Sequence, residues 1–226
     1  MAISVTEIQN RISSLVDQSG TAPTEGGTDW STRLSYLNTA LHEFEQLYDW
    51  QALYKEYTTF TSTSTGNTSI SLPQDFRKFG SFPQLLGTDF PEIRPQEKSG
   101  KLVSDKYVYI LGNPAVGHTM VVNSGLSDRQ LPSGASIFVS YYATAGSLVS
   151  GSQVPQIPDP DFLVKRTVAL HWEASDDARY QVAKGEADKI LQRMLERENV
   201  HSEANNDGSM VRNVEQTKYS FRIGRN

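Results

Sequence analysis

Apolar side chains recur at helical spacing in two stretches of the first quarter of the chain, and we expect each stretch to form a helix. Before the first stretch, Ser4 is followed three residues later by Glu7, which is the capping-box arrangement of a helix start. The apolar stripe consists of Val5, Ile8, Ile12, Leu15 and Val16. The segment from Ser19 to Thr28 has no periodicity and is rich in Gly and Thr, so it is predicted to be an exposed loop.

The second helix is predicted to be longer, with Asp29 or Ser31 as its cap and its end near Leu53. One face carries large apolar residues at helical spacing: Leu34, Leu37, Leu41, Phe44, Leu47 and Tyr48. Burying each such side chain contributes roughly 1.5–3 kcal/mol, so this face is predicted to lie in the core. Trp50, near the end of the helix, is expected to close the bottom of that core.

After Lys55 the period changes from helical to alternating. A Thr-rich run to Ser62 predicts a strand, the pair Gly66-Asn67 a turn, and Ile70 with Leu72 a second strand that ends at Pro73. Further strands are predicted at Tyr107 to Leu111, Thr119 to Asn123 and Ser136 to Tyr142. Short strands with regular turn signals are typical of an antiparallel sheet or a small sandwich.

Helical periodicity returns after a Gly-, Ser- and Pro-rich linker from Gly146 to Pro160. Asp159-Pro160-Asp161 predicts the start of a helix that ends near Ser175. Asp176 is expected to cap a last helix that ends near His201. The apolar side of this last helix consists of Ala178, Val182, Ala183, Ala187, Ile190, Leu191, Met194 and Leu195.

This order of elements predicts an α+β fold, in which a β subdomain is inserted into a four-helix bundle. Neither helical pair buries its apolar stripe alone, so two N-terminal and two C-terminal helices are expected to close over each other. The expected boundaries are 1–53 and 159–203 for the bundle, 54–158 for the antiparallel β subdomain, and 204–226 for an extended C-terminal arm.

The C-terminal arm carries too few apolar residues for a core of its own, yet its end is patterned. Tyr219, Phe221 and Ile223 alternate with polar and cationic residues, and this period of two predicts a strand with one apolar face. The strand could add to the protein's own sheet, or it could dock on another protein. In the second case the three apolar residues are the anchors, and Arg222 and Arg225 meet carboxylates at the rim.

Composition narrows the chemistry of the chain. The 226 residues include no cysteine, which excludes disulfides, thiolate metal sites and cysteine nucleophiles. The formal net charge of -5 lacks the basic footprint of a general DNA binder. No apolar run approaches the length of about eighteen residues that suggests a membrane span, so no membrane contact is expected. The first residues lack the pattern of a signal peptide, so we expect the chain to be made in the cytosol.

Catalytic motifs are absent from the sequence. There is no Walker-type phosphate loop and no Gly-x-Ser-x-Gly elbow, and the four histidines are scattered without metal-ligand spacing. We therefore predict no catalytic, cofactor-binding or metal-binding residues. The strongest remaining candidates are the carboxylates of Asp89 and Glu92, which could act as acid and base on a glycoside. A solvated loop is the favoured interpretation of this acidic pair.

Two other groups have both a chemical and a structural interpretation. His171, close in sequence to Asp176, could be a general base, but a histidine beside capping aspartates is more often structural. The pairs Tyr141-Tyr142 and Tyr107/Tyr109 could stack on sugars or bases, but aromatic residues on strands more often pack across strands.

Two segments of the chain resemble a known family. A helix from Leu41 runs into Tyr48-Asp49-Trp50-Gln51-Ala52-Leu53 and is followed, after polar strands, by Leu72-Pro73-Gln74-Asp75-Phe76. This order resembles the head-to-tail adaptor, or connector, proteins of short-tailed bacteriophages, in which a Trp-x-x-Leu helix end precedes a Leu-Pro-x-Asp-Phe step. The alanine-containing last helix and the polar tail also fit that family.

The resemblance implies a structural virion protein without cofactors or catalysis. Its copies would form a ring, typically of about twelve, in the neck beneath the portal. The β portion would face the next tail protein, the C-terminal arm would dock on the portal, and genome DNA would pass through the channel without specific binding. Two alternatives stay open: another neck or tail component, such as a stopper or tail-tube subunit, and a carbohydrate-binding or cell-wall-degrading β module.

Overall fold

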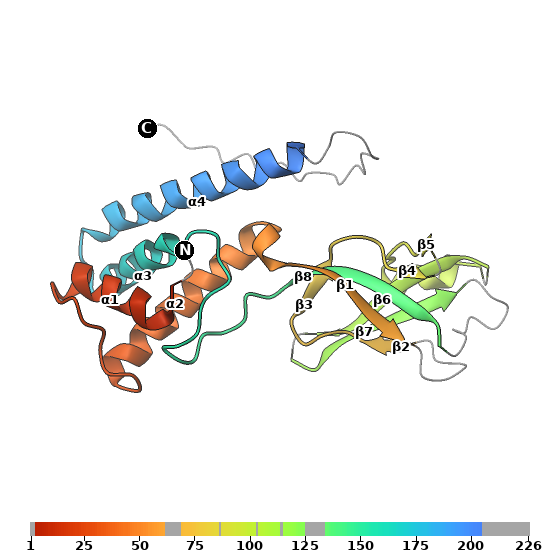
Figure 1. Cartoon of the computed structure of the whole chain (residues 1–226), viewed down its shortest axis with the longest axis horizontal. Helices are drawn as coiled ribbons and strands as arrows, with labels where there is room; N and C mark the ends of the chain where they lie inside the picture. The colour runs from red at the N-terminus through yellow and green to blue at the C-terminus, as the bar shows by residue number, and fades with distance from the viewer. Residues whose placement is uncertain are drawn as a thin grey trace.

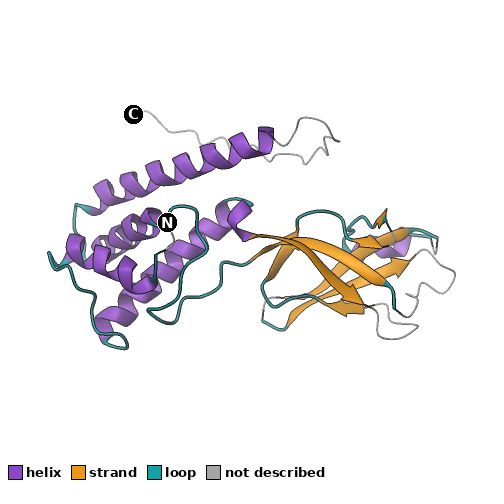
Figure 2. Cartoon of the chain, in the orientation of Figure 1, coloured by secondary structure: helices purple, strands orange, loops and turns teal. Residues whose placement is uncertain are grey.

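The molecule is elongated, with its helices at one end and its strands at the other (Figures 1 and 2). The computed structural model describes residues 3–61, 69–85, 87–102, 104–113, 115–124 and 134–204. The predicted Gly66-Asn67 turn lies outside these residues. So does the proposed anchor strand of the C-terminal arm, with Tyr219, Phe221, Arg222, Ile223 and Arg225.

Four helices form one packed unit: α1 (Val5–Val16), α2 (Thr28–Leu47), α3 (Asp161–Ala174) and α4 (Tyr180–Ala204). α3 contacts each of the other three helices, so it joins the two pairs. Their apolar stripes meet in a single core that includes Ile8, Leu41, Leu163 and Ala187. The prediction that two N-terminal and two C-terminal helices pack together is confirmed.

The start of α1 depends on a distant segment as well as on its predicted cap. Ser4 Oγ accepts a hydrogen bond from the backbone N of Glu7 at 3.3 Å, as expected. The backbone N–H groups of Val5 and Thr6 donate to carbonyl oxygens of the linker after β8, at 2.8 and 3.0 Å. A Cβ atom at Gly151 would lie 2.3 Å from Thr6 Oγ1, so this close approach requires glycine. The predicted linker is therefore fastened along the bundle.

α2 begins earlier and ends earlier than predicted. Its N-cap is Gly27, without a side-chain cap, and neither Asp29 nor Ser31 fills that role. It ends at Leu47 because the indole N–H of Trp50 donates to the carbonyl O of Phe44 at 2.7 Å. In a continuing helix that carbonyl would accept from residue 48. Gln51–Leu53 form a short 3-10 helix, η1, instead of the last turn of α2.

Three large side chains assigned to apolar stripes are exposed: Leu15 by 37%, Leu47 by 51% and Val182 by 65%. Leu47 is the last residue of α2 and Val182 lies in the first turn of α4, where the neighbouring helices no longer cover them. α4 also begins later than predicted. Asp177, and not Asp176, accepts a hydrogen bond from the backbone N of Arg179, at 2.9 Å.

The β subdomain consists of two antiparallel sheets that share one core. The strands are β1 (Tyr54–Thr61), β2 (Ser69–Ser71), β3 (Phe76–Phe79), β4 (Gln84–Leu85), β5 (Thr88–Asp89), β6 (Lys106–Asn113), β7 (Gly117–Ser124) and β8 (Ser136–Ala143). One sheet has the order β1-β8-β4-β5, with β3 also paired to β8, and the other has the order β2-β7-β6. Val108 and Met120 from one sheet meet Ile137 and Val139 from the other, which confirms the predicted sandwich.

The pattern of the sequence did not predict the short strands β3 to β5 or a 3-10 helix, η2 (Pro95–Gly100). β4 and β5 have two residues each, too few to show an alternating pattern. β3 and β4 both pair with β8, more than fifty residues further along the chain.

Candidate functional site: the joint between the bundle and the β subdomain

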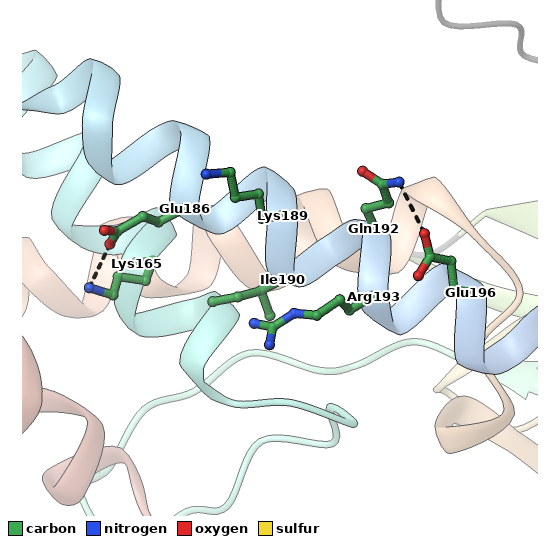
Figure 3. Close-up of a pocket in the computed structure, with 7 residues that line it drawn as sticks. All are labelled: Lys165, Glu186, Lys189, Ile190, Gln192, Arg193 and Glu196. Atoms are coloured by element: carbon green, nitrogen blue, oxygen red, sulfur yellow. Dashed lines mark hydrogen bonds and ion pairs between the residues drawn. The ribbon is translucent and has the colours of Figure 1, made fainter.

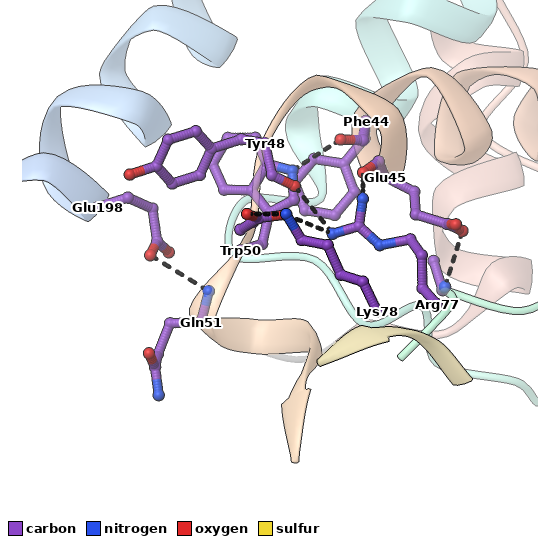
Figure 4. Close-up of polar contacts among 10 residues, drawn as sticks. Phe44, Glu45, Tyr48, Trp50, Gln51, Arg77, Lys78 and Glu198 are labelled. Carbon is purple, nitrogen blue, oxygen red and sulfur yellow. Dashed lines mark hydrogen bonds and ion pairs between the residues drawn. The ribbon is translucent and has the colours of Figure 1, made fainter. Parts of the chain in front are cut away.

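Polar and aromatic side chains gather where α2 passes into β1, between the bundle and the β subdomain (Figure 4). We call this cluster the joint. It consists of Phe44, Glu45, Tyr48, Asp49, Trp50, Arg77, Lys78 and Tyr142, and Glu198 reaches it from α4.

Arg77 on β3 caps the C-terminal end of α2. Its Nη1 donates to the carbonyl O of Glu45 at 3.0 Å, and its Nη2 donates to that of Tyr48 at 3.3 Å. The last carbonyl groups of a helix have no partner within the helix, and they carry the negative end of its dipole. A guanidinium from the β subdomain therefore satisfies groups that the bundle leaves open.

Asp49 holds two cations of β3 in place. Its Oδ1 pairs with Arg77 Nη2 at 2.9 Å, and its Oδ2 pairs with the ammonium of Lys78. Both cations lie over the ring of Tyr142, at 6.0 Å for Arg77 Cζ and 5.7 Å for Lys78 Nζ. Burial raises the pKa of Tyr142 to about 12, and the nearby negative charge of Asp49 adds to this effect. The phenol is thus held in its neutral form.

The Leu-Pro-x-Asp-Phe segment anchors the β side of the joint. Leu72 and Phe76 are buried in the core of the sandwich. The carboxylate of Asp75 accepts a hydrogen bond from Tyr141 Oη at 3.1 Å and forms an ion pair with Lys55, which raises the pKa of the lysine. Asp75 therefore ties the start of β3 to both β1 and β8, next to the residue that caps α2.

The C-terminal helical pair also reaches the joint. Glu198 Oε2 on α4 accepts from the backbone N of Gln51 at 3.3 Å. On the other side, Glu45 Oε2 accepts from the backbone N of Ala145, where the chain leaves β8, at 2.9 Å. The joint thus binds α2, α4 and both connections to the sandwich.

A second feature is an open groove of 640 Å³ along α4, next to Lys165 of α3 (Figure 3). Its lining residues are Lys165, Glu186, Lys189, Ile190, Gln192, Arg193 and Glu196. Lys165 and Glu186 form an ion pair at 2.7 Å, and Gln192 Nε2 donates to Glu196 at 3.0 Å. A lining made mainly of charged and polar side chains suits a solvated protein surface.

The structure does not bring the two candidate acids together. Asp89 lies in β5, where its Oδ1 accepts from Gln84 Nε2 of β4 at 2.8 Å. Glu92 bridges towards Val108 of the other sheet, and partial burial raises the pKa of its carboxyl group. The depression around Glu92 contains Arg94 and Glu97 but not Asp89. The pair does not line a shared site.

The remaining candidates have structural partners. His171 packs edge-on against Tyr36, with ring centroids 6.3 Å apart, and the neighbouring carboxylate of Asp177 is bound by Arg179. The rings of Tyr107 and Tyr109 lie 6.4 Å apart on one side of β6. Tyr142 belongs to the joint, whereas Tyr141 is buried in the core of the sandwich and donates a hydrogen bond to Asp75.

The described ranges contain neither a candidate metal site nor a helix that could cross a membrane. These ranges contain no group of three or more His, Cys, Asp or Glu residues placed to hold a metal ion. None of the helices in the described part of the chain is both long enough and apolar enough to cross a membrane.

A helical bundle tied by a polar joint to a β sandwich defines the class of this molecule: an α+β protein that carries a β arm on a helical base. The family model described as SU10 adaptor protein matches residues 3–213. The chain therefore belongs to the SU10 adaptor protein family, and its role is that of a structural adaptor in the neck of a phage. A comparison with curated proteins finds no match.

Proposed function

We propose that this chain is the head-to-tail adaptor of a short-tailed phage. Copies of it form a ring of about twelve between the portal and the tail, and DNA passes through the central channel during ejection. The observation that carries the proposal is the family match, which extends over both helical pairs and the β subdomain. The net charge of -5 supports it, because a strongly cationic channel would retard the phosphate backbone.

In this proposal the parts of the chain have separate tasks. The helical bundles pack side by side in the ring, and the β subdomain faces the next tail protein. The arm at 204–226 docks on the portal through Tyr219, Phe221 and Ile223, with Arg222 and Arg225 at portal carboxylates. Support for the arm comes from its period of two and from its shortage of apolar residues for a core.

The direct test is to mix the purified chain with purified portal protein and measure mass by light scattering after size exclusion. The free chain should be a monomer or weak oligomer, because its copies repel one another and many weak contacts become effective only on a template. With portal, it should elute in a large complex. A stable ring in dilute solution without portal would contradict templated assembly, and turnover of a glycan would favour the cell-wall enzyme.

A truncation isolates the arm. Removing residues 205–226 leaves the whole of α4 in place, so the melting temperature should stay nearly unchanged while portal capture is lost. A second variant, Arg222→Glu with Arg225→Glu in the full chain, should also weaken capture. Because it keeps the full length, it tests the charges of the arm separately from its removal. A truncated chain that captures portal normally would refute docking through the arm.

A further inference from the structure

A cationic cavity of 380 Å³ lies on the outer side of the β2-β7-β6 sheet, beside η2. Its polar and aromatic lining consists of Lys98, Ser99, Lys101, Tyr107, Tyr109 and Asn123. Val121 and Val122 complete the wall. We call it the distal pocket. It is distinct from the joint, with which it shares no residue.

Among the described residues, the lining of the distal pocket includes two ammonium groups and no carboxylate. The nearest acids in sequence are engaged elsewhere: Glu97 accepts from the backbone N of Arg94, and Asp105 accepts from that of Leu102. Lys98 Nζ lies 5.6 Å from the centre of the Tyr109 ring. Within the described ranges neither lysine has an ion-pair partner. On a chain of net charge -5, this is a local positive site over an aromatic floor.

The distal pocket lies at the end of the sandwich that is remote from the bundle. The turn between β6 and β7 lies near the joint. His118 follows this turn, and its ring centroid is 5.5 Å from that of Phe76, which directly precedes Arg77. Tyr107 pairs with Asn123 towards the opposite end of the same hairpin. η2 is drawn at that outer part of the β subdomain (Figure 2). The pocket therefore lies in the half of the sandwich that is turned away from the helices.

We propose that the distal pocket binds a glutamate or aspartate side chain from an acidic segment of the next tail protein. This inference rests on the proposed function, since it assigns partner chemistry to the β end of the adaptor. Two ammonium groups match a carboxylate, and the tyrosine rings can pack on the aliphatic stem of a glutamate. Duplex DNA favours a row of cations along a face, whereas this cavity fits one or two side chains.

The test uses an acetylated and amidated hexaglutamate peptide as probe, followed by NMR of the full chain. The peptide should shift the amide signals of residues 98–101 and 107–109. Lys98→Glu with Lys101→Glu should weaken binding at least roughly tenfold, because two attractive contacts become repulsive. The matched control is Lys106→Glu with Lys184→Glu, which changes net charge equally at exposed sites outside the pocket and should bind nearly as the wild type does.

Each outcome decides the inference. Equal weakening by both double variants would mean a general charge effect and would overturn it. If a short DNA duplex shifts the same signals more strongly than hexaglutamate does, the ligand of the distal pocket is a phosphate group and the carboxylate proposal is wrong. If a variant loses peptide binding but still captures portal, its defect is confined to the distal pocket. Failure of the wild type to capture portal would instead overturn the proposed function and leave the peptide result standing.

Discussion

The joint and the distal pocket both place two cations beside tyrosine rings on the same β subdomain, yet their surroundings differ. At the joint, Arg77 and Lys78 lie over Tyr142 and are paired with Asp49 and with helix carbonyl groups. At the distal pocket, Lys98 lies over Tyr109 without a carboxylate in the lining. Cations that are neutralised within the chain hold its parts together, whereas cations with no ion-pair partner among the described residues are available to another molecule.

The two sites should therefore differ in how much they contribute to the stability of the folded chain. Substitutions at the joint should lower the free energy of unfolding, since they leave buried groups without partners. Substitutions in the distal pocket should affect binding and leave the fold intact.

Phe44→Ala should have the largest effect, because Phe44 is fully buried and stacks on Trp50 with ring centroids 4.5 Å apart. Removing a buried phenylalanine costs about 3–5 kcal/mol through lost contacts and the cavity left behind. Chemical denaturation would measure this loss. Leu47→Ala, in the same helix but largely exposed, is the control and should change little. A stable Phe44→Ala protein that failed only in assembly would mean that this face is an interface.

Arg77→Ala should destabilise the chain by about 1–3 kcal/mol, because two helix carbonyls and Asp49 lose their shared partner. It should also loosen the angle between the two parts, which double electron–electron resonance between spin labels on α2 and β7 would show as a broader distance distribution. Lys78→Ala, at a half-exposed ion pair with the same Asp49, should cost less than about 1 kcal/mol. Equal effects of the two substitutions would argue against the capping role.

The raised pKa of Tyr142 predicts how the stability of the folded chain changes at alkaline pH. Its pKa is raised to about 12 from the ordinary 10.0, so the folded state holds the proton more tightly than the unfolded state. The resulting stability is complete below about pH 10 and is lost as pH rises towards 12. Denaturation midpoints measured across this window should fall more steeply for the wild type than for Tyr142→Phe. Identical slopes would show that the phenol is not held neutral by the joint.

Lys98→Ala with Lys101→Ala should have the smallest effect on stability, within about 0.5 kcal/mol of the wild type. Neither ammonium forms an ion pair within the described ranges, so the fold loses only solvated charge and the contact of Lys98 with the Tyr109 ring. Thermal unfolding, monitored by circular dichroism, would measure the stability of this double variant. A loss comparable to that of Arg77→Ala would place these lysines among the groups that hold the fold together, and the contrast between the two sites would disappear.

Local pattern was sufficient for the elements that bury one continuous face. The stripe at Ile8 and Ile12, the cap at Ser4 and the alternation in β1 each report a periodic environment, and the helices and long strands formed close to where these patterns place them. The Leu-Pro-x-Asp-Phe segment, together with the order of elements, indicated a phage adaptor protein, and the family match shows an adaptor family, while the short-tailed type stays a proposal. The docking arm around Tyr219 and Phe221 stays a prediction, since it lies outside the described residues.

Tertiary structure decided what depends on partners distant in sequence. α2 stops at Leu47 because the indole N–H of Trp50 donates to the carbonyl O of Phe44 and because Arg77, some thirty residues later, caps the helix end. β3 and β4 exist because β8 supplies their hydrogen bonds, and the distal pocket exists because η2 lies beside β6. Periodicity along the chain specifies which face of an element is buried. It does not specify which donor and acceptor will meet once the chain has closed its long loops.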